Sequence, residues 1–225
     1  LVFASEMKGI LAHTDVPRAR DGQAFHDFLN FRFVPGPATL LESVKSLRPG
    51  HLFTWHAGRV EERPFLDLPR QDSIPDSPED LDLEIRRRIS LSVSRHLLSD
   101  VPLGAYLSGG LDSTAIVASM ARAGVLPLRT FTLGFGDRSD ETAEAHRSAE
   151  FYATEHHEET LSPDALADYP RAIWHVEEPR VNILQSYRVA RMARRRVTVI
   201  LSGLGGDELF GGYHTHRWFS IAGRV

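Results

Sequence analysis

The serines, glycines and aspartate at 108–113 match an anion-binding turn in residue type and in spacing. The segment reads Ser-Gly-Gly-Leu-Asp-Ser, the apolar run at 101–107 predicts a buried strand before it, and 114–123 predicts a packed helix after it. Glycine lets the backbone turn tightly beside a ligand, and the amides and dipole of a helix start attract anions. Because Asp112 would repel a bare phosphate, the pattern predicts a phosphate site bridged by Mg²⁺. The alternative is a plain strand-to-helix turn capped by Asp112.

A second stretch of this kind occupies 202–213. It reads Ser-Gly-Leu-Gly-Gly-Asp-Glu-Leu-Phe-Gly-Gly-Tyr and follows the apolar run at 197–201. Five glycines in twelve residues give a backbone that can wrap closely around a nucleotide. Asp207 and Glu208 are hard oxygen ligands, which with Asp112 could hold magnesium against a polyphosphate. Alone, this stretch could be a turn and helix cap, but two such loops after strands of one sheet favour a shared site.

The elements that must position both loops alternate between strands and helices. Apolar runs predict strands, and amphipathic or small-residue segments predict helices; the strands are at 101–107, 128–135 and 197–201, and the helices are at 79–99, 113–123, 140–155 and 184–195. This alternation predicts an α/β fold with a parallel sheet that is buried on both faces. Ligands of such sheets bind beyond the carboxyl ends of the strands, which is where both loops lie.

The first part of the chain has a mixed α and β pattern. A helix is expected at 21–33, and Ala57-Gly58 lies between two short strands of an expected hairpin. Proline, aspartate and serine gather at 69–78, which predicts a linker. We therefore expect one domain at 1–68 and a second at 79–225.

Composition excludes several classes of protein. The chain has 225 residues, of which 42% are hydrophobic and 25% charged, so it has an ordinary globular balance. A net charge of −4 argues against a general nucleic-acid binder. No apolar run reaches the length of a membrane span, and no signal peptide is apparent. The absence of cysteine excludes disulfides and thiolate chemistry within these residues. These features favour a cytoplasmic protein, and the missing initiator Met favours an internal fragment.

His156 and His157 raise the question of a second metal site. Adjacent residues of a strand point to opposite faces of a sheet, so the two imidazoles cannot readily share one ion. We expect neither to be a ligand.

The segment 108–113 resembles the pyrophosphate loop of ATP pyrophosphatases, which cleave ATP to AMP and pyrophosphate. Together with 202–213 it resembles the synthetase domain of glutamine-hydrolysing asparagine synthetases. Phe3–Gly9 is similar to the end of the glutaminase domain of that family, and 47–51 to its final hairpin region. The resemblance implies an adenine nucleotide α-hydrolase-like fold that follows the C-terminal part of an α+β, Ntn-type glutaminase domain. It also implies that ATP adenylates aspartate and that ammonia from glutamine displaces AMP, and a homodimer is possible for such a protein.

The resemblance assigns roles to residues of both loops. Asp112 and Asp207 would carry Mg²⁺ and, with Glu208, form the catalytic set. The residues that would bind ATP are, for the pyrophosphate, Ser108, Gly109, Gly110, Leu111, Asp112 and Ser113, and for the AMP pocket, Tyr106, Leu133, Ser202 and Gly203.

Three features depart from the pattern of the family. The glutaminase nucleophile of the family is an N-terminal cysteine, and this chain has none. Leu204 stands where an acid is usual, and 180–184 differs in a region that helps to form the acceptor pocket. These departures leave open a related enzyme that closes a β-lactam or a peptide macrolactam. A third alternative is a non-catalytic remnant that binds nucleotide.

Overall fold

The computed structural model describes residues 1–66, 77–136, 140–178, 180, 182–216 and 218. Its internal contacts divide the chain into two compact units, 1–74 with 164–184, and 75–163 with 185–225. Most of the linker predicted at 69–78 lies outside the described residues, and the domain boundaries stay a prediction. Within the described residues, no helix combines the length and the hydropathy that a membrane crossing requires.

The first unit contains short helices and one hairpin. Its elements are α1 (Met7–Leu11), α2 (Gly22–Phe31), β1 (His51–His56), β2 (Arg59–Pro64), most of the 3₁₀-helix η1 (Pro163–Asp168), and α6 (Tyr169–Val176). The antiparallel pair β1–β2 confirms the predicted hairpin. Helix α2 begins where the Asp21 carboxylate accepts a hydrogen bond from the Ala24 N–H at 2.9 Å, which satisfies one of the amides that a helix start leaves free.

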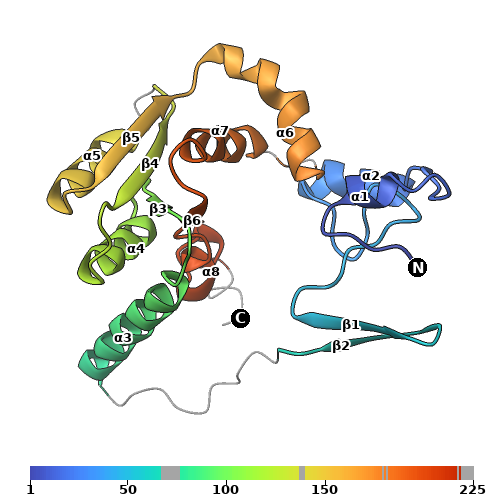
Figure 1. The fold of residues 1–225 in the computed structure, drawn as a ribbon, viewed down its shortest axis with the longest axis horizontal. Coiled ribbons are helices and arrows are strands. Elements are labelled where there is room, and N and C mark those ends of the chain that lie inside the picture. Colours follow the sequence, from blue (N-terminus) through green and yellow to red (C-terminus); the bar gives the residue numbers. More distant parts are fainter. Residues whose placement is uncertain (67–76, 137–139, 179, 181, 217, 219–225) are drawn as a thin grey trace. The chain divides into compact units, whose positions relative to one another are not determined.

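The second unit is built on a parallel sheet, as predicted (Figure 1). Its strands, in the spatial order β5-β4-β3-β6, are β5 (Glu155–Thr160), β4 (Arg129–Gly134), β3 (Leu103–Tyr106) and β6 (Val199–Leu201). The helices are α3 (Pro78–His96), α4 (Leu111–Arg122), α5 (Thr142–Phe151), α7 (Ile183–Ala193) and α8 (Gly206–Phe210). The first two residues of α7 belong to the first unit.

Alternate residues of the central strands enter two separate cores. Ala105 and Leu201 belong to the core that α3, α4 and α5 complete. Tyr106 and Ile200 pack in the other core, with Phe131 and residues of α7. The side-chain period of two therefore gives each strand two buried faces, as the near-continuous apolar runs predict.

Strand β5 corrects the predicted helix at 140–155. Helix α5 ends at Phe151, and Ala153 then takes a positive φ of 51° that turns the chain. The Glu155 N–H donates to the Leu128 carbonyl at 2.8 Å and starts β5 beside β4. The strand sequence Glu-His-His-Glu-Glu-Thr contains no apolar residue, so it lacks the usual strand pattern.

The strand order places the two glycine-rich loops side by side. From β3 the chain builds outward through β4 to β5, and it then returns to the opposite side of β3 as β6. The sheet thus changes direction between β3 and β6, whose residues Ala105 and Leu201 are partners. Crevices at such reversal points are where open α/β sheets bind ligands.

His156 and His157 lie on opposite faces of β5, as expected. His156 Nδ1 lies 2.9 Å from the hydroxyl of fully buried Thr130, and its ring lies 6.1 Å from that of His146 on α5. His157 packs on Phe131, with ring centroids 5.3 Å apart. The nearest acids are distant for a hydrogen bond: His157 Nε2 lies 3.5 Å from a Glu155 oxygen, and His156 Nε2 lies 3.9 Å from a Glu158 oxygen. Burial is the main reason that the pKa of each imidazole lies below its ordinary value.

We predict that the second unit loses stability as the pH falls below about 6.5, the ordinary pKa of histidine. The folded chain binds protons at His156 and His157 more weakly than the unfolded chain, so protonation favours unfolding, and the loss continues down to the lowered folded pKa. Urea titrations at pH 7.5 and 5.5 measure this. His156→Gln should reduce the difference between the two midpoints, whereas His96→Gln, on an exposed part of α3, should not. Equal differences in both variants would contradict the assignment.

Candidate functional site

Two serines brace the loop that follows β3. The Ser113 hydroxyl donates to the Gly110 carbonyl at 3.1 Å and accepts from the Ser108 N–H at 3.1 Å. The Ser108 hydroxyl lies 3.0 Å from the Ser113 hydroxyl. Gly110 is the N-cap of α4 and has no side chain to occupy the helix start. The first-turn amides of α4 are therefore presented at the mouth of the loop, as an anion site requires.

Gly109 is required by both its conformation and its surroundings. Its φ is +82°, and a Cβ atom there would lie 2.6 Å from the Glu144 Cβ and 2.7 Å from the Ala145 nitrogen. Only glycine fits this position without moving the start of α5.

The loop that follows β6 lies directly against the first loop. A Cβ at Gly203 would lie 2.7 Å from the backbone nitrogen of Ser113, and one at Gly206 would collide with the Asp112 carboxylate. Gly205, the N-cap of the short helix α8, has a φ of +101°. The glycines thus let the backbone of the second loop touch the start of α4, with Asp112 between the loops.

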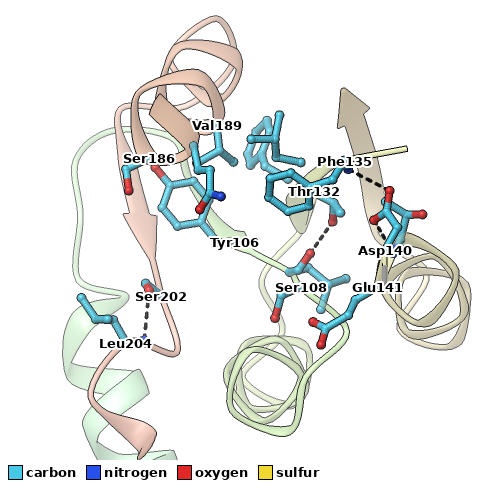
Figure 2. A pocket seen from close by; sticks show the side chains of 15 residues that line it. Tyr106, Ser108, Thr132, Phe135, Asp140, Glu141, Ser186, Val189, Ser202 and Leu204 are labelled. Atoms are coloured by element: carbon cyan, nitrogen blue, oxygen red, sulfur yellow. Dashed lines mark hydrogen bonds between the residues drawn. The ribbon is translucent and has the colours of Figure 1, made fainter. Parts of the chain in front are cut away.

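Two cavities open at this junction. The first has a volume of about 600 Å³ and extends from the ends of β3 and β4 to α7 (Figure 2). The second, of about 440 Å³, lies over the start of α4 and the second loop. Ser108 lines both of them. The size of the first cavity is in the range of small-molecule and cofactor sites.

The predicted site residues divide between these cavities. The first cavity is lined by Tyr106, Ser108, Leu133 and Ser202. The second is lined by Ser108, Gly110, Leu111, Asp112, Ser113 and Asp207. Gly109, Gly203 and Glu208 line neither cavity, although both glycines determine how the loops pack.

Asp112 and Asp207, one from each loop, line the second cavity, as does Glu141 from the segment before α5. Carboxylate oxygens suit Mg²⁺, which commonly takes only one or two of them and completes its shell with phosphate and water. The described residues contain no group of three or more His, Cys, Asp or Glu that could hold a metal. A pair of aspartates on this cavity, beside the start of α4, fits magnesium that arrives with a nucleotide better than a permanent metal centre.

Glu208 faces a different partner. It accepts a hydrogen bond from the Tyr213 hydroxyl at 2.8 Å. This bond holds the pKa of the Glu208 carboxyl below its usual range and raises the pKa of the Tyr213 phenol. The catalytic role expected for Glu208 stays a prediction.

Tyr106 supplies a neutral hydrogen-bonding group to the first cavity. Its ring packs in the core with Phe131, and burial raises the pKa of its phenol. At physiological pH the hydroxyl therefore stays protonated and can donate.

Residues without a predicted role also shape the first cavity. Asp140 accepts hydrogen bonds from the N–H groups of Phe135 and Gly136 at 2.8 and 2.9 Å. The Gly136 N–H is the largest cause of the lowered pKa of the Asp140 carboxyl. Helix α7 supplies Ser186 and Val189 to the opposite wall (Figure 2), and its Gln185 also lines the cavity. The sequence contained a signal for Asp140, because this acid follows a strand and a Gly-x-Gly turn. The spacing of residues in α7, in contrast, did not indicate which side of the helix faces a ligand.

Comparison with known proteins identifies the family of the chain. The family model described as asparagine synthase matches residues 84–224. The chain belongs to the asparagine synthase family. The model of the glutamine amidotransferase domain matches residues 1–66. Both parts of the resemblance read from the sequence are therefore confirmed.

Relatives carry names from this family and beyond. Glutamine-hydrolysing asparagine synthetase 1 of Bacillus subtilis (strain 168) is 36% identical over 96% of this chain and 34% of its own length. Asparagine synthetase 3 of the same strain, also named glutamine-hydrolysing, is 28% identical over 98% of this chain and 38% of its own. Amidase chyE of Penicillium rubens is 31% identical over 80% of this chain and 30% of its own length. The chain thus spans about a third of the length of these relatives. A solved structure of NMN synthetase from Francisella tularensis aligns with 55% of this chain and 53% of its own chain. The TM-score is 0.37 and the sequence identity is 16%, so the likeness supports no argument.

We predict that Gly203→Ala separates the two loops. Its Cβ would meet the Ser113 nitrogen at 2.7 Å and the Asp112 carbonyl carbon at 2.9 Å, and neither backbone atom can rotate away. The variant should lose about 1–3 kcal/mol of stability and bind magnesium ATP more weakly. Unfolding titrations and calorimetry measure the two effects. Gly22→Ala on α2, where a Cβ would meet nothing within 4 Å, is the control. A Gly203→Ala variant with unchanged nucleotide binding would mean that the approach of the loops does not form the site.

Proposed function

We propose that the protein carrying this chain forms an amide through an acyl-adenylate, with aspartate, ATP and ammonia from glutamine as substrates and asparagine, AMP and pyrophosphate as products. One observation carries the proposal: two glycine-rich loops meet at the reversal point of the sheet, with Asp112 and Asp207 on one cavity and a nucleotide-sized cavity beside it. The names of the asparagine synthetase relatives support it.

The two cavities suggest how ATP would lie. The adenosine would occupy the first cavity, between Tyr106 and α7, and the phosphates would pass Ser108 into the second. There the α4 amides and the braced serines would receive the β and γ phosphates. Asp112 and Asp207 would hold magnesium, which when bound neutralises the charge that develops on the leaving pyrophosphate. The carboxylate of the acid would then attack the α phosphorus, and the bond to the β phosphate would break.

Ammonia would come from the glutamine amidotransferase part of the protein. Residues 1–66 match that domain, but the chain contains no cysteine, so the thiolate expected of this family is not among these 225 residues. The cytoplasmic location and the homodimer expected from the sequence stay predictions.

A related enzyme that acts on another acid is the second candidate. Apart from the neutral phenol of Tyr106, the ionisable side chains that line the two cavities, within the described residues, are all carboxylates: Asp112, Asp140, Glu141 and Asp207. Leu204 lines the first cavity with 87% of its surface exposed, and its N–H donates to the Ser202 hydroxyl at 3.0 Å. An acceptor that carries a second carboxylate meets no counter-charge on these walls. An acid with an apolar or cationic body would fit them better than aspartate.

The first prediction from this proposal concerns Asp112. Asp112→Asn should lower ATP-dependent pyrophosphate release by about 100-fold or more, because a neutral amide binds magnesium much more weakly than a carboxylate does. Pyrophosphate assays measure the effect, and circular dichroism checks the fold. The control is Asp82→Asn, on the exposed face of α3, where Asp82 pairs with Arg86. Unchanged turnover in Asp112→Asn would remove this residue from the mechanism.

The second prediction separates the two candidates. Leu204→Glu should raise aspartate-dependent pyrophosphate release severalfold if Leu204 has shifted the acceptor, because a carboxylate can contact the ammonium group of aspartate. Leu209→Glu is the matched control, since Leu209 is 81% exposed in the same loop and lines neither cavity. The parent and both variants are assayed with aspartate and with a panel of monocarboxylic acids. No response to Leu204→Glu would count against a role for this position in selecting the acid.

A further inference from the structure

The Glu177 carboxylate joins two segments that are far apart in the sequence. It accepts hydrogen bonds from the Lys8 N–H at 2.8 Å and from the Met7 N–H, and it pairs with the Lys8 ammonium at 3.1 Å. Its side chain is only 15% exposed. The C-terminal end of α6 is thereby attached to the first turn of α1, within the first compact unit.

Local structure explains why the contact forms. Glu177 ends α6 with a φ of 63°, and its N–H closes the helix on the Ile173 carbonyl at 2.7 Å. Helix α1 lacks a side-chain cap of its own, since Glu6 at its N-cap position makes no such bond. Glu177 supplies the missing acceptor from outside the helix and complements the positive end of its dipole.

The charges around Glu177 favour the ionised form. Burial alone would raise the pKa of its carboxyl, but the Lys8 and Met7 N–H groups and the Lys8 ammonium outweigh it and hold the pKa below its usual value. The Lys8 nitrogen also lies 5.9 Å from the centre of the Trp174 ring, which adds a cation–π contact from the same helix. Trp174 of α6 and Glu177 at the end of that helix thus both contact Lys8 of α1.

The contact joins residues that belong to two different family matches. Met7 and Lys8 belong to the range that matches the glutamine amidotransferase domain, and Glu177 belongs to the range that matches asparagine synthase. Six residues after Glu177 the chain enters α7, whose residues Gln185 and Val189 line the first cavity. The attached end of α6 is therefore close in sequence to the helix that lines this cavity.

We propose that Glu177 is a positioning residue that fixes α6 on the amidotransferase segment, and that this attachment couples glutamine hydrolysis to amide formation. The inference rests on the proposed function. Ammonia that escapes into water is diluted and protonated, so its productive use depends on how the two active parts are held. Loss of the attachment should leave both reactions running while less of the ammonia reaches the adenylated acid.

The test measures glutamate and amide product together in the full-length protein that carries this chain. With glutamine as nitrogen source, Glu177→Ala should raise the ratio of glutamate to amide by about threefold or more, while the rate with ammonium chloride stays within about twofold of the parent. Glu177→Gln keeps an acceptor for the α1 amides and should be intermediate. Hydrogen exchange at Met7 and Lys8 should quicken in the same order. Glu178→Gln is the matched control, because Glu178 is the adjacent acid and pairs with Arg180 at 2.8 Å.

Two results would overturn the inference. A ratio in Glu177→Ala equal to that in Glu178→Gln would leave Glu177 with a purely structural role. An equal loss with glutamine and with ammonium chloride would place its effect on the synthetase reaction itself. Failure of the proposed function is distinguishable, because the unmodified protein would then release no pyrophosphate with any acid, before any variant is compared.

Discussion

The contact between the two glycine-rich loops is the constraint on which the candidate site depends. Strands β3 and β6 are neighbours at the reversal point of the sheet, so the loops that follow them leave the same edge together. The backbone of Gly203 then lies against the start of α4 so closely that no Cβ atom fits. Asp112 is thereby held between the loops, on the same cavity as Asp207. Without this approach the acidic residues would be separate turn residues, and the candidate site would have one wall.

Charge gives the site a second constraint. The described walls of both cavities carry carboxylates and no cationic side chain, which would repel a polyphosphate that arrived alone. The amides at the start of α4 supply part of the missing positive potential, and a magnesium ion bound with the nucleotide would supply the rest. The charges on these walls also bear on which acid the site would accept. Leu204 is exposed and offers apolar surface, whereas an acid with a second carboxylate would need a cationic partner there.

Much of this arrangement could be predicted from sequence because its signals are local. The apolar runs before residues 108 and 202, and the glycines after them, specify strand, turn and helix over a few residues. Strand β5 has no apolar pattern, because its polar side chains are paired across the sheet or packed on α5, and the predicted helix at 140–155 extended past the end of α5 at Phe151. The cavity wall from α7 and the contact of Glu177 with α1 depend on tertiary packing over many residues, which no local pattern encodes.

The most direct test of the central claim follows one oxygen atom. The full-length protein is incubated with MgATP, ammonia and an acceptor acid whose carboxylate carries ¹⁸O, and the nucleotide and phosphate products are analysed by mass spectrometry. An acyl-adenylate requires that a carboxylate oxygen bonds to the α phosphorus and leaves with AMP when ammonia attacks the carbonyl carbon. The account predicts ¹⁸O in AMP and none in pyrophosphate. Label in inorganic phosphate, with ADP as the nucleotide product, would contradict it.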